Sequence, residues 1–475
     1  MPSVGPQAAK PLSSGSTQNF KPHPYQKRAV KKMLENPCIG LFLHPGLGKT
    51  SITLMAMRIL GDQGFIKGVL VIAPLRAVYN VWPAEIKKWE EFKHLDIGIL
   101  HDDDKDQVLN EEHDFYAINP EGVMWLVEKL KKIPKERWPF DVLVVDESVK
   151  FKDSQTKRFK ALRPILNNFK RRYILTGTPT PNGLMDLFGQ IYILDQGNAL
   201  TPFITHYRNK FFIPSGYGGY TWLPQFDAMD RITERVAPLT LTMTREEYLQ
   251  MPELVQQMVW MELPAAARKI YRDIEKNFIT LINNQPITAP SAAAAGVKCR
   301  QVLNGALYTG EDKDWVPIHD VKIGALLDLI EELSGQPLLV LYEFIHDKER
   351  LVAEFTKRKI NFGLLGGQSM KKDQVVIDAF NAGKLPVVLG HPASMGEALN
   401  LQGECAHICW FGLTWNFYHY DQAIQRVWRQ GNKATHVIAY HLCIKNSLDE
   451  TVVGTLNSKD RTQEDFTRRV KLLAK

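Results

Sequence analysis

Short apolar runs that do not alternate with polar residues constrain the fold of this chain most strongly. Four of them lie in its first part, at 39–43, 68–73, 142–145 and 173–175. Strands that are apolar on both faces are expected in parallel sheets covered by helices on both sides. Stretches with helical character, such as 51–60, separate the runs. The sequence therefore predicts a doubly wound α/β sheet.

Apolar runs separated by helical stretches appear again near the end of the chain, after a stretch without this pattern. Apolar runs recur at 338–342, 387–389 and 406–410. The residues before them are rich in aromatic, Pro, Gly and Ala residues and favour a largely helical connector. We predict a flexible tail at 1–19, a first lobe at 20–196, an insertion or connector at 197–318, a second lobe at 319–458 and a C-terminal tail or helix at 459–475.

Composition and charge exclude several classes of protein. Charged residues make up 23% of the chain and apolar residues 44%, which are globular proportions. No apolar run approaches the roughly 18 residues that a membrane span needs, and the start of the chain carries no export signal. The five cysteines form no C-x-x-C pair and indicate a reducing compartment. We expect a cytoplasmic protein without a membrane partner, and its net charge of +7 permits a polyanionic one.

A glycine-rich loop lies between the first predicted strand and the helix after it. Its residues Gly46, Gly48, Lys49 and Thr50 fit G-x-G-K-[ST], in which backbone N–H groups and a helix N-terminus hold phosphate oxygens. Lys49 would neutralise the β- and γ-phosphates, and the Thr50 hydroxyl would ligate Mg²⁺. The longer pattern has a further glycine where this chain has Leu43, so a glycine turn without a nucleotide is the alternative.

A pair of carboxylates follows the third apolar run. Asp146 and Glu147 come directly after Val-Leu-Val-Val, and the carboxyl end of a parallel strand faces the crevice where open α/β sheets bind ligands. Asp146 is expected to hold Mg²⁺, and Glu147 to orient and deprotonate the attacking water. Two solvated acids at a strand end are the alternative, which the phosphate loop disfavours.

Two arginines of the second lobe complete the candidate chemistry. A helical pattern at 422–431 places Gln422, Arg426 and Arg429 on one face. Guanidinium groups from a second domain can stabilise the charge that develops on a transferred phosphoryl group. Surface salt bridging is the alternative for these arginines. If they act on a phosphate, catalysis depends on closure of the two lobes.

Together these ordered motifs resemble those of the superfamily-two helicase-like ATPases, specifically the Swi/Snf-type DNA translocases. The resemblance covers about residues 21–456 and rests also on the T-G-T-P stretch at 176–179 and on the segments at 394–401 and 415–431. It implies two RecA-like lobes, with ATP and Mg²⁺ as cofactors and DNA as the partner. The sequence of residues 391–402 resembles that of compact, phage- or prophage-encoded members of this family.

The resemblance also implies roles for residues outside the catalytic motifs. Gln26, in the leading His-Pro-Tyr-Gln, corresponds to the glutamine that reads adenine, and Gly396 to a nucleotide-binding position. The residues that it implies in coupling or DNA contact are Pro74, Lys150, Lys152, Thr176, Thr178, Asn400 and Trp415. Ser148 and Val149 depart from the family pattern, since they stand where it has the Ala and His of D-E-A-H.

We therefore expect a monomeric motor that hydrolyses ATP to ADP and phosphate and moves on duplex or forked DNA. Phosphate contacts carry no base information, so the movement is expected to be independent of sequence. A strand-separating helicase is one alternative, which needs a wedge for which 217–222 is the only candidate. A non-hydrolysing, ATP-gated DNA clamp is another, and the presence of Glu147 and both arginines argues against it.

Overall fold

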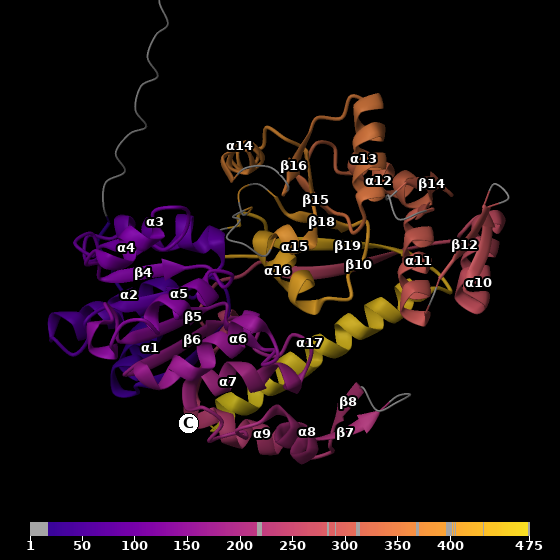
Figure 1. Ribbon diagram of the computed structural model, residues 1–475. Helices are drawn as coiled ribbons and strands as arrows, with labels where there is room; N and C mark the ends of the chain where they lie inside the picture. Colours follow the sequence, from indigo (N-terminus) through magenta and orange to yellow (C-terminus); the bar gives the residue numbers. More distant parts are fainter. Residues whose placement is uncertain are drawn as a thin grey trace, which may run out of the picture.

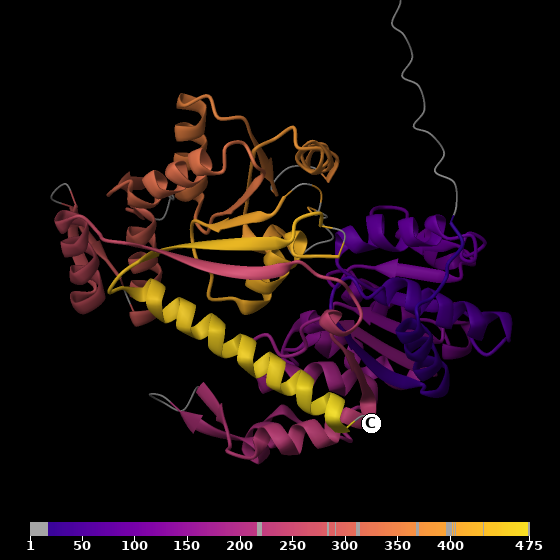
Figure 2. The same cartoon turned by 180° about the vertical axis from the view of Figure 1, so that it is seen from behind.

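The chain folds into two lobes, each built around a parallel sheet with helices on both faces (Figures 1 and 2). The computed structural model describes residues 18–215, 221–282, 285–289, 291–309, 314–366, 370–395, 401, 403, 405–430 and 432–473. The sheet topology confirms the predicted α/β class with two doubly wound lobes. Among the described residues, no helix is both long and apolar enough to cross a membrane.

The sheet of lobe 1 has seven strands in the order β3-β4-β2-β5-β6-β1-β9. Its strands are β1 (Cys38–Leu43), β2 (Val69–Ile72), β3 (Ile97–Ile99), β4 (Phe115–Ile118), β5 (Val142–Asp146), β6 (Arg171–Thr176) and β9 (Thr240–Met243). The helices of this lobe are α1 (Pro24–Glu35), α2 (Lys49–Asp62), α3 (Trp82–Lys88), α4 (Lys105–Asn110), α5 (Val123–Leu130), α6 (Lys157–Leu162), α7 (Leu187–Asp195), α8 (Ile204–Phe211) and α9 (Ala228–Val236).

Strand β5 shows why the apolar runs do not alternate. Val142 and Val144 pack into the hydrophobic core on one face of the sheet, and Leu143 and Val145 pack into the core on the other. Successive side chains of a strand point to opposite faces, so a strand covered on both faces needs apolar residues at every position. Asp146, the last residue of β5, therefore lies at the carboxyl edge of the sheet.

The sheet of lobe 2 has six strands in the order β10-β19-β18-β15-β17-β16. They are β10 (Glu253–Met261), β15 (Leu338–Leu341), β16 (Phe362–Leu365), β17 (Val387–Gly390), β18 (His407–Trp410) and β19 (His436–Ile444). The helices of this lobe are α12 (Val321–Glu332), α13 (Ile345–Lys357), α14 (Met370–Asn381), α15 (Pro392–Met395) and α16 (Phe417–Val427).

Residues 197–318, expected as one connector, contribute strands to both sheets. Strand β9 pairs with β1 of lobe 1, whereas β10 pairs along its whole length with β19 of lobe 2. The chain thus crosses between the sheets in the short segment from 244 to 252. The other elements of the region are the helices α10 (Ala265–Asn277) and α11 (Ala292–Asn304) and the pairs β7 (Phe212–Ser215) with β8 (Thr221–Pro224), β11 (Ile279–Ile282) with β12 (Gln285–Thr288), and β13 (Ala306–Tyr308) with β14 (Trp315–Pro317).

The last helix, α17 (Leu448–Leu473), runs from lobe 2 to lobe 1 (Figures 1 and 2). Its start follows β19 in lobe 2, and near its end Phe466 and Val470 are buried in the core of lobe 1. The ring of Phe466 lies 6.3 Å from that of Phe42 in β1. One helix therefore bridges the two lobes.

Phe466→Ala is expected to destabilise lobe 1 and to release the end of α17. Phe466 is fully buried, and removal of a buried phenyl ring costs about 3–5 kcal/mol. We expect a lower unfolding midpoint in urea and faster cleavage of α17 by trypsin. The matched control is Leu472→Ala, an exposed position of the same helix, which should change stability by less than about 0.5 kcal/mol. Equal effects of the two substitutions would show that α17 is not anchored through its apolar side.

Candidate active site

The glycine-rich loop joins β1 to α2 in a backbone conformation that requires glycine. Gly46 and Gly48 have φ values of 91° and 79°, in the left-handed region. A Cβ atom on Gly48 would lie 2.5 Å from Nε2 of Gln26, so this glutamine touches the loop. Lys49 begins α2, and its Nζ donates a hydrogen bond of 2.9 Å to the carbonyl of Leu43. The loop and the N-terminus of α2 form one wall of a cavity that can receive an anion.

Gly48→Ala is expected to weaken ATP binding at least tenfold, because the added Cβ strains the backbone and collides with Gln26. The left-handed conformation alone costs an alanine about 1–2 kcal/mol. Titration with a fluorescent ATP analogue measures the change. Gly61→Ala is the matched control in α2, since its Cβ meets no atom within 4 Å and alanine favours a helix. If both variants bound the analogue equally, the conformation of the loop would not control binding.

The two carboxylates lie across the cavity from the loop. The Asp146 carboxylate accepts hydrogen bonds from Nε1 of Trp82 at 3.2 Å and from the backbone N–H of Glu147 at 3.0 Å. Burial, followed by the charge of Glu147, raises the pKa of Asp146 to about 6. Glu147 has a φ of 52°, a left-handed conformation that is uncommon outside glycine and recurs at functional sites. The two acids thus face a place where a positive charge is favoured.

The donor set at this place fits Mg²⁺ as a partner of a nucleotide. The Thr50 hydroxyl and the Asp146 carboxylate line the same cavity, and both are oxygen donors, which Mg²⁺ prefers. No group of three His, Cys, Asp or Glu side chains able to hold a metal occurs within the described ranges. Mg²⁺ usually takes one or two carboxylates and completes its shell with phosphate oxygens and water.

Lobe 2 supplies the opposite wall of the cavity. Gln422, Arg426 and Arg429 line it together with Lys49 and Glu147 of lobe 1. Arg426 is only 8% exposed, and its guanidinium donates to the Gln422 side chain. Burial lowers the pKa of Arg426, while the charge of Glu147 acts in the opposite direction. Side chains from both lobes therefore meet in one cavity of about 670 Å³.

Arg429 reaches this cavity from outside the helix, which corrects the expected helical stripe over 422–431. Helix α16 ends at Val427, and Trp428 has a ψ of 83° that no helix continues. The indole of Trp428 donates to the Pro252 carbonyl at 2.7 Å, and the Arg245 guanidinium lies 3.6 Å from its ring centre. These contacts with residues far away in the sequence hold Trp428 out of the helix.

The structure adds residues that the motifs did not single out. The hydroxyl of Tyr418 in α16 donates to Oε2 of Glu147 at 3.5 Å, across the two lobes. Tyr418 precedes Gln422 by four residues and therefore lies on the same face of the helix. This spacing could have identified Tyr418 from the sequence. Phe20 and Trp89 line the cavity near Gln26, with their ring centres 5.1 Å apart. The Gln26 side chain is fixed by the His23 N–H at 2.9 Å and the Leu47 carbonyl at 3.4 Å.

The described residues expected in coupling or DNA contact have different surroundings. Pro74 lines the cavity, and the Thr176 hydroxyl accepts the backbone N–H of the buried Thr178 at 3.2 Å. Lys152 pairs with Asp186 at 3.1 Å. Lys150 lies in the 3-10 helix Ser148–Phe151, and Trp415 lies before α16. Asn400 lies outside the described residues, as does Gly396, which was expected to contact the nucleotide.

The departure at Ser148 has a structural role. Its hydroxyl donates to Oε1 of Gln190 at 2.8 Å, and Nε2 of Gln190 donates to the Pro179 carbonyl at 2.7 Å. This buried chain of hydrogen bonds joins the segment of Asp146 and Glu147 to the T-G-T-P stretch. Alanine at position 148 could not make the first of these bonds.

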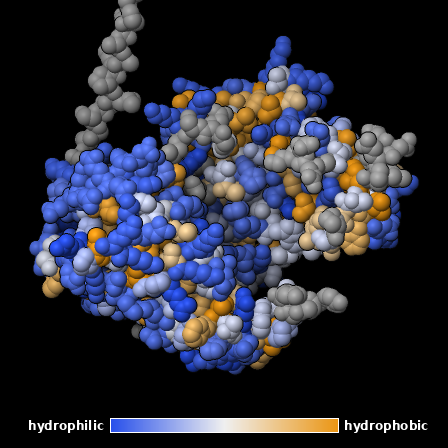
Figure 3. All heavy atoms as spheres, in the orientation of Figure 1, coloured by the Kyte–Doolittle hydropathy of each residue, from blue (hydrophilic) through white to orange (hydrophobic). Residues whose placement is uncertain are grey.

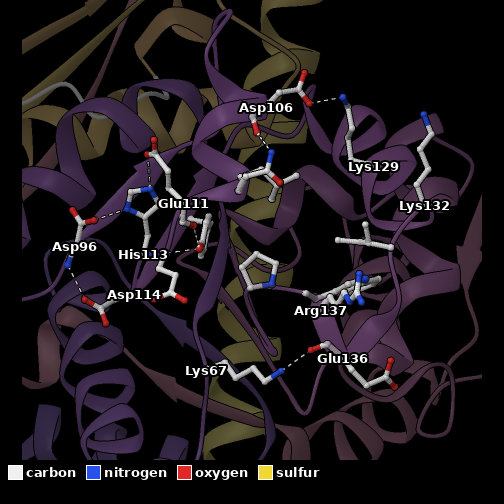
Figure 4. Close-up of a pocket in the computed structure, with 17 residues that line it drawn as sticks. Lys67, Asp96, Asp106, Glu111, His113, Asp114, Lys129, Lys132, Glu136 and Arg137 are labelled. Atoms are coloured by element: carbon white, nitrogen blue, oxygen red, sulfur yellow. Dashed lines mark hydrogen bonds and ion pairs between the residues drawn. The ribbon is translucent and has the colours of Figure 1, made fainter.

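A larger cavity of about 940 Å³ in lobe 1 contains none of the expected site residues. Some of its charged side chains are paired with one another, as Asp96 is with His113 and Asp106 with Lys129 (Figure 4). Lys67 donates to the Glu136 carbonyl at 2.8 Å on the other side of the opening. Lys49, Asp146, Glu147 and Arg426 line the smaller cavity between the lobes instead.

Comparison with known proteins gives two family matches. Residues 25–306 match the model of the SNF2-related domain, and residues 321–431 match the helicase conserved C-terminal domain. The chain is 31% identical over 464 residues to protein p41 of Acyrthosiphon pisum secondary endosymbiont phage 1, which covers 94% of this chain and 98% of that protein.

More distant relatives are longer. The chain is 24% identical to the chromatin remodeling factor mit1 of Schizosaccharomyces pombe over 92% of this chain but only 32% of that protein. It is 22% identical to the uncharacterized ATP-dependent helicase YqhH of Bacillus subtilis, over 93% of this chain and 78% of that protein. A solved structure, the Sulfolobus solfataricus SWI2/SNF2 ATPase core in complex with dsDNA, aligns with 96% of this chain at 22% identity and a TM-score of 0.43.

Proposed function

The chain belongs to the SNF2-related, Swi/Snf-type family of DNA-dependent ATPases in helicase superfamily two, and from this premise we propose that it is a translocase on duplex DNA. It hydrolyses ATP to ADP and phosphate in the cavity between its lobes and converts each turnover into movement along duplex or forked DNA. It acts as a monomer in the cytoplasm of a bacterial or phage-infected cell.

The shared cavity is the observation that carries this proposal. Lys49 and Asp146 reach it from lobe 1, and Arg426 and Arg429 reach it from lobe 2. A triphosphate bound there contacts both walls, so it favours the closed arrangement. Loss of the γ-phosphoryl group removes the bridge between the walls, and the lobes can then move relative to one another.

The side chains divide the chemistry of hydrolysis among them. The loop N–H groups and Lys49 hold the phosphates, and Gln26 with the Phe20–Trp89 pair contacts the base. Glu147 orients the attacking water and takes its proton, while the Tyr418 hydroxyl holds this carboxylate in place. Arg426 and Arg429 stabilise the charge that develops on the transferred group. Mg²⁺ held by Thr50 and Asp146 neutralises phosphate charge when bound.

Cationic side chains at the lobe junction support a DNA backbone contact. Lys459 of α17 donates to the Trp415 carbonyl at 2.9 Å and to Asn182 at 3.2 Å. Burial, followed by the charge of Lys152, lowers the pKa of Lys459, so the two lysines lie near one another. Lys152 belongs to lobe 1 and Trp415 to lobe 2, so DNA held here would respond to movement of the lobes.

ATPase rates with different nucleic acids test the proposed function. We expect weak activity without nucleic acid or with RNA, and strong stimulation by duplex and forked DNA that falls steeply with salt. Stimulation by RNA or single-stranded DNA equal to that by duplex DNA would contradict the assignment.

Strand separation is the competing function, and two displacement assays distinguish it from translocation. The wedge candidate at 217–222 lies mostly outside the described residues, with Trp222 in β8. A translocase displaces the third strand of a triplex without opening a partial duplex. Unwinding of the partial duplex would favour a helicase.

A further inference from the structure

A second cavity lies between the lobes, separate from the one proposed to hold ATP. Its volume is about 690 Å³, which suits a small organic ligand. Its walls come from Thr178 after β6, from the 3-10 helix Arg245–Glu247, from α16 and from α17. On the face seen in Figure 1, the surface is hollowed between the two lobes (Figure 3). Helix α16 separates the cavities, because Gln422 and Arg426 line the first while Asp421 and Gln425 line the second.

Buried polar atoms without a partner line this second cavity. Nε2 of Gln425, a side chain only 3% exposed, donates to Oδ1 of Asp421 at 2.6 Å. Oε1 of Gln425 and Oδ2 of Asp421 have no hydrogen-bond partner in the part of the chain that the structure describes. A buried polar atom left unpaired costs about 1–3 kcal/mol, so both acceptors favour a ligand that donates hydrogen bonds.

The charges in the cavity are unevenly compensated. The Arg245 guanidinium stacks on Trp428 and pairs with Glu246 at 3.2 Å, and Lys471 pairs with Glu247 at 2.9 Å. Lys471 is therefore engaged with Glu247, whereas the charge of Arg245 is shared between Glu246 and the acids Asp421 and Asp460.

The carboxylates of Asp421 and Asp460 have no such ion pair among the described residues. Burial, followed by the charge of Asp421, raises the pKa of Asp460 to about 7, and burial raises that of Asp421 to about 6. Burial is the largest cause of both shifts, and the charge of Arg245 acts in the opposite direction on both acids, so it compensates them only in part. A cation bound between α16 and α17 would compensate both acids.

The neighbouring side chains favour an organic cation over a metal ion. Phe417, Tyr420 and Trp428 line the same cavity and give it apolar surface, which suits a ligand with methylene groups between its charges. The described residues contain no cluster of three acidic, His or Cys side chains that could hold a metal. An extended molecule with several ammonium groups matches acceptors that come from two different helices.

We propose that this cavity binds an aliphatic diamine or polyamine through Asp421, Gln425 and Asp460. The ammonium groups donate to the unpartnered oxygens of α16 and to the carboxylate of α17. Because α16 carries Arg426 on its other side and α17 bridges the lobes, the bound cation restrains the lobes and lowers ATP turnover. This last effect rests on the proposed function, whereas the binding itself does not.

Isothermal titration of the protein with spermidine, without nucleotide or DNA, tests the binding. We expect one saturable site, weakened about tenfold or more by Asp460→Asn and by Asp421→Asn. Asp460 is partly exposed, so its variant should fold even if Asp421→Asn does not. Asp328→Asn, at an exposed position of α12, is the matched control and should bind like the unaltered protein.

Three outcomes would overturn the proposal. The first is that neither spermidine nor putrescine shows saturable binding. The second is that the Asp460→Asn and Asp328→Asn variants bind spermidine with equal affinity. The third is that Mg²⁺ displaces spermidine as well as putrescine does at matched ionic strength. A separate measurement addresses regulation, since spermidine should lower the ATP turnover of the unaltered protein more than that of Asp460→Asn. Binding without this difference would overturn the regulatory part alone and leave the ATPase assignment unaffected.

Discussion

Replacing Arg426 with alanine is expected to lower the DNA-stimulated ATP turnover number by about three orders of magnitude. The guanidinium reaches the cavity from lobe 2 and lies close enough to Glu147 for that charge to affect its pKa. Its contribution is largest where negative charge develops on the phosphoryl group, so kcat should fall far more than ATP affinity. Steady-state ATPase assays at saturating duplex DNA measure the effect.

Arg426 is buried, so the test of this prediction needs a check on folding and a matched arginine. Arg272→Ala, at an exposed position of α10, should leave turnover unchanged. Thermal melting establishes whether Arg426→Ala is folded, and Arg426→Lys keeps the charge but not the planar donor geometry. A folded Arg426→Ala variant with a turnover within about tenfold of normal would rule out a catalytic role for this side chain.

Glu147→Gln is expected to reduce turnover by about 10² to 10⁴ while ATP and DNA still bind. The amide has nearly the shape of the carboxylate but cannot accept the proton of the attacking water. The glutamine side chain still has an oxygen that can accept the hydrogen bond from the Tyr418 hydroxyl, so this contact between the lobes should be retained. Single-turnover hydrolysis separates the chemical step from binding.

Glu112→Gln serves as the control for this substitution, because Glu112 is exposed on lobe 1 away from the cavity. If unaltered protein with DNA turned over ATP no faster than Glu147→Gln, the chain would be an ATP-gated clamp rather than a motor. This result would be distinguishable from a folding defect, since the variant should retain normal affinity for a fluorescent ATP analogue.

The fold and the lobe 1 half of the site could be predicted from the sequence, because their signals are local. Apolar runs such as 142–145 need only the alternation of side chains along a strand to indicate burial on both faces. Gly48 and Lys49 are adjacent, and their chemistry depends on the backbone of one turn. Asp146 could be placed at a sheet edge because it ends a strand.

Contacts between distant residues could not be predicted in this way. The short strand β9 and the more polar β10 belong to different sheets, and only their pairings with β1 and β19 show this. Arg429 reaches the cavity because Pro252 and Arg245 hold Trp428 out of the helix.

The sequence by itself determined two parallel-sheet lobes, a phosphate loop and the residue types available for hydrolysis. The tertiary structure alone decided that Arg426 and Glu147 line one cavity from different lobes, that α17 bridges the lobes, and that a second cavity lined by Asp421 and Asp460 lies behind α16. The reason is physical: strand and loop chemistry is set by neighbours along the chain, whereas burial, charge compensation and lobe contact depend on packing between residues hundreds of positions apart.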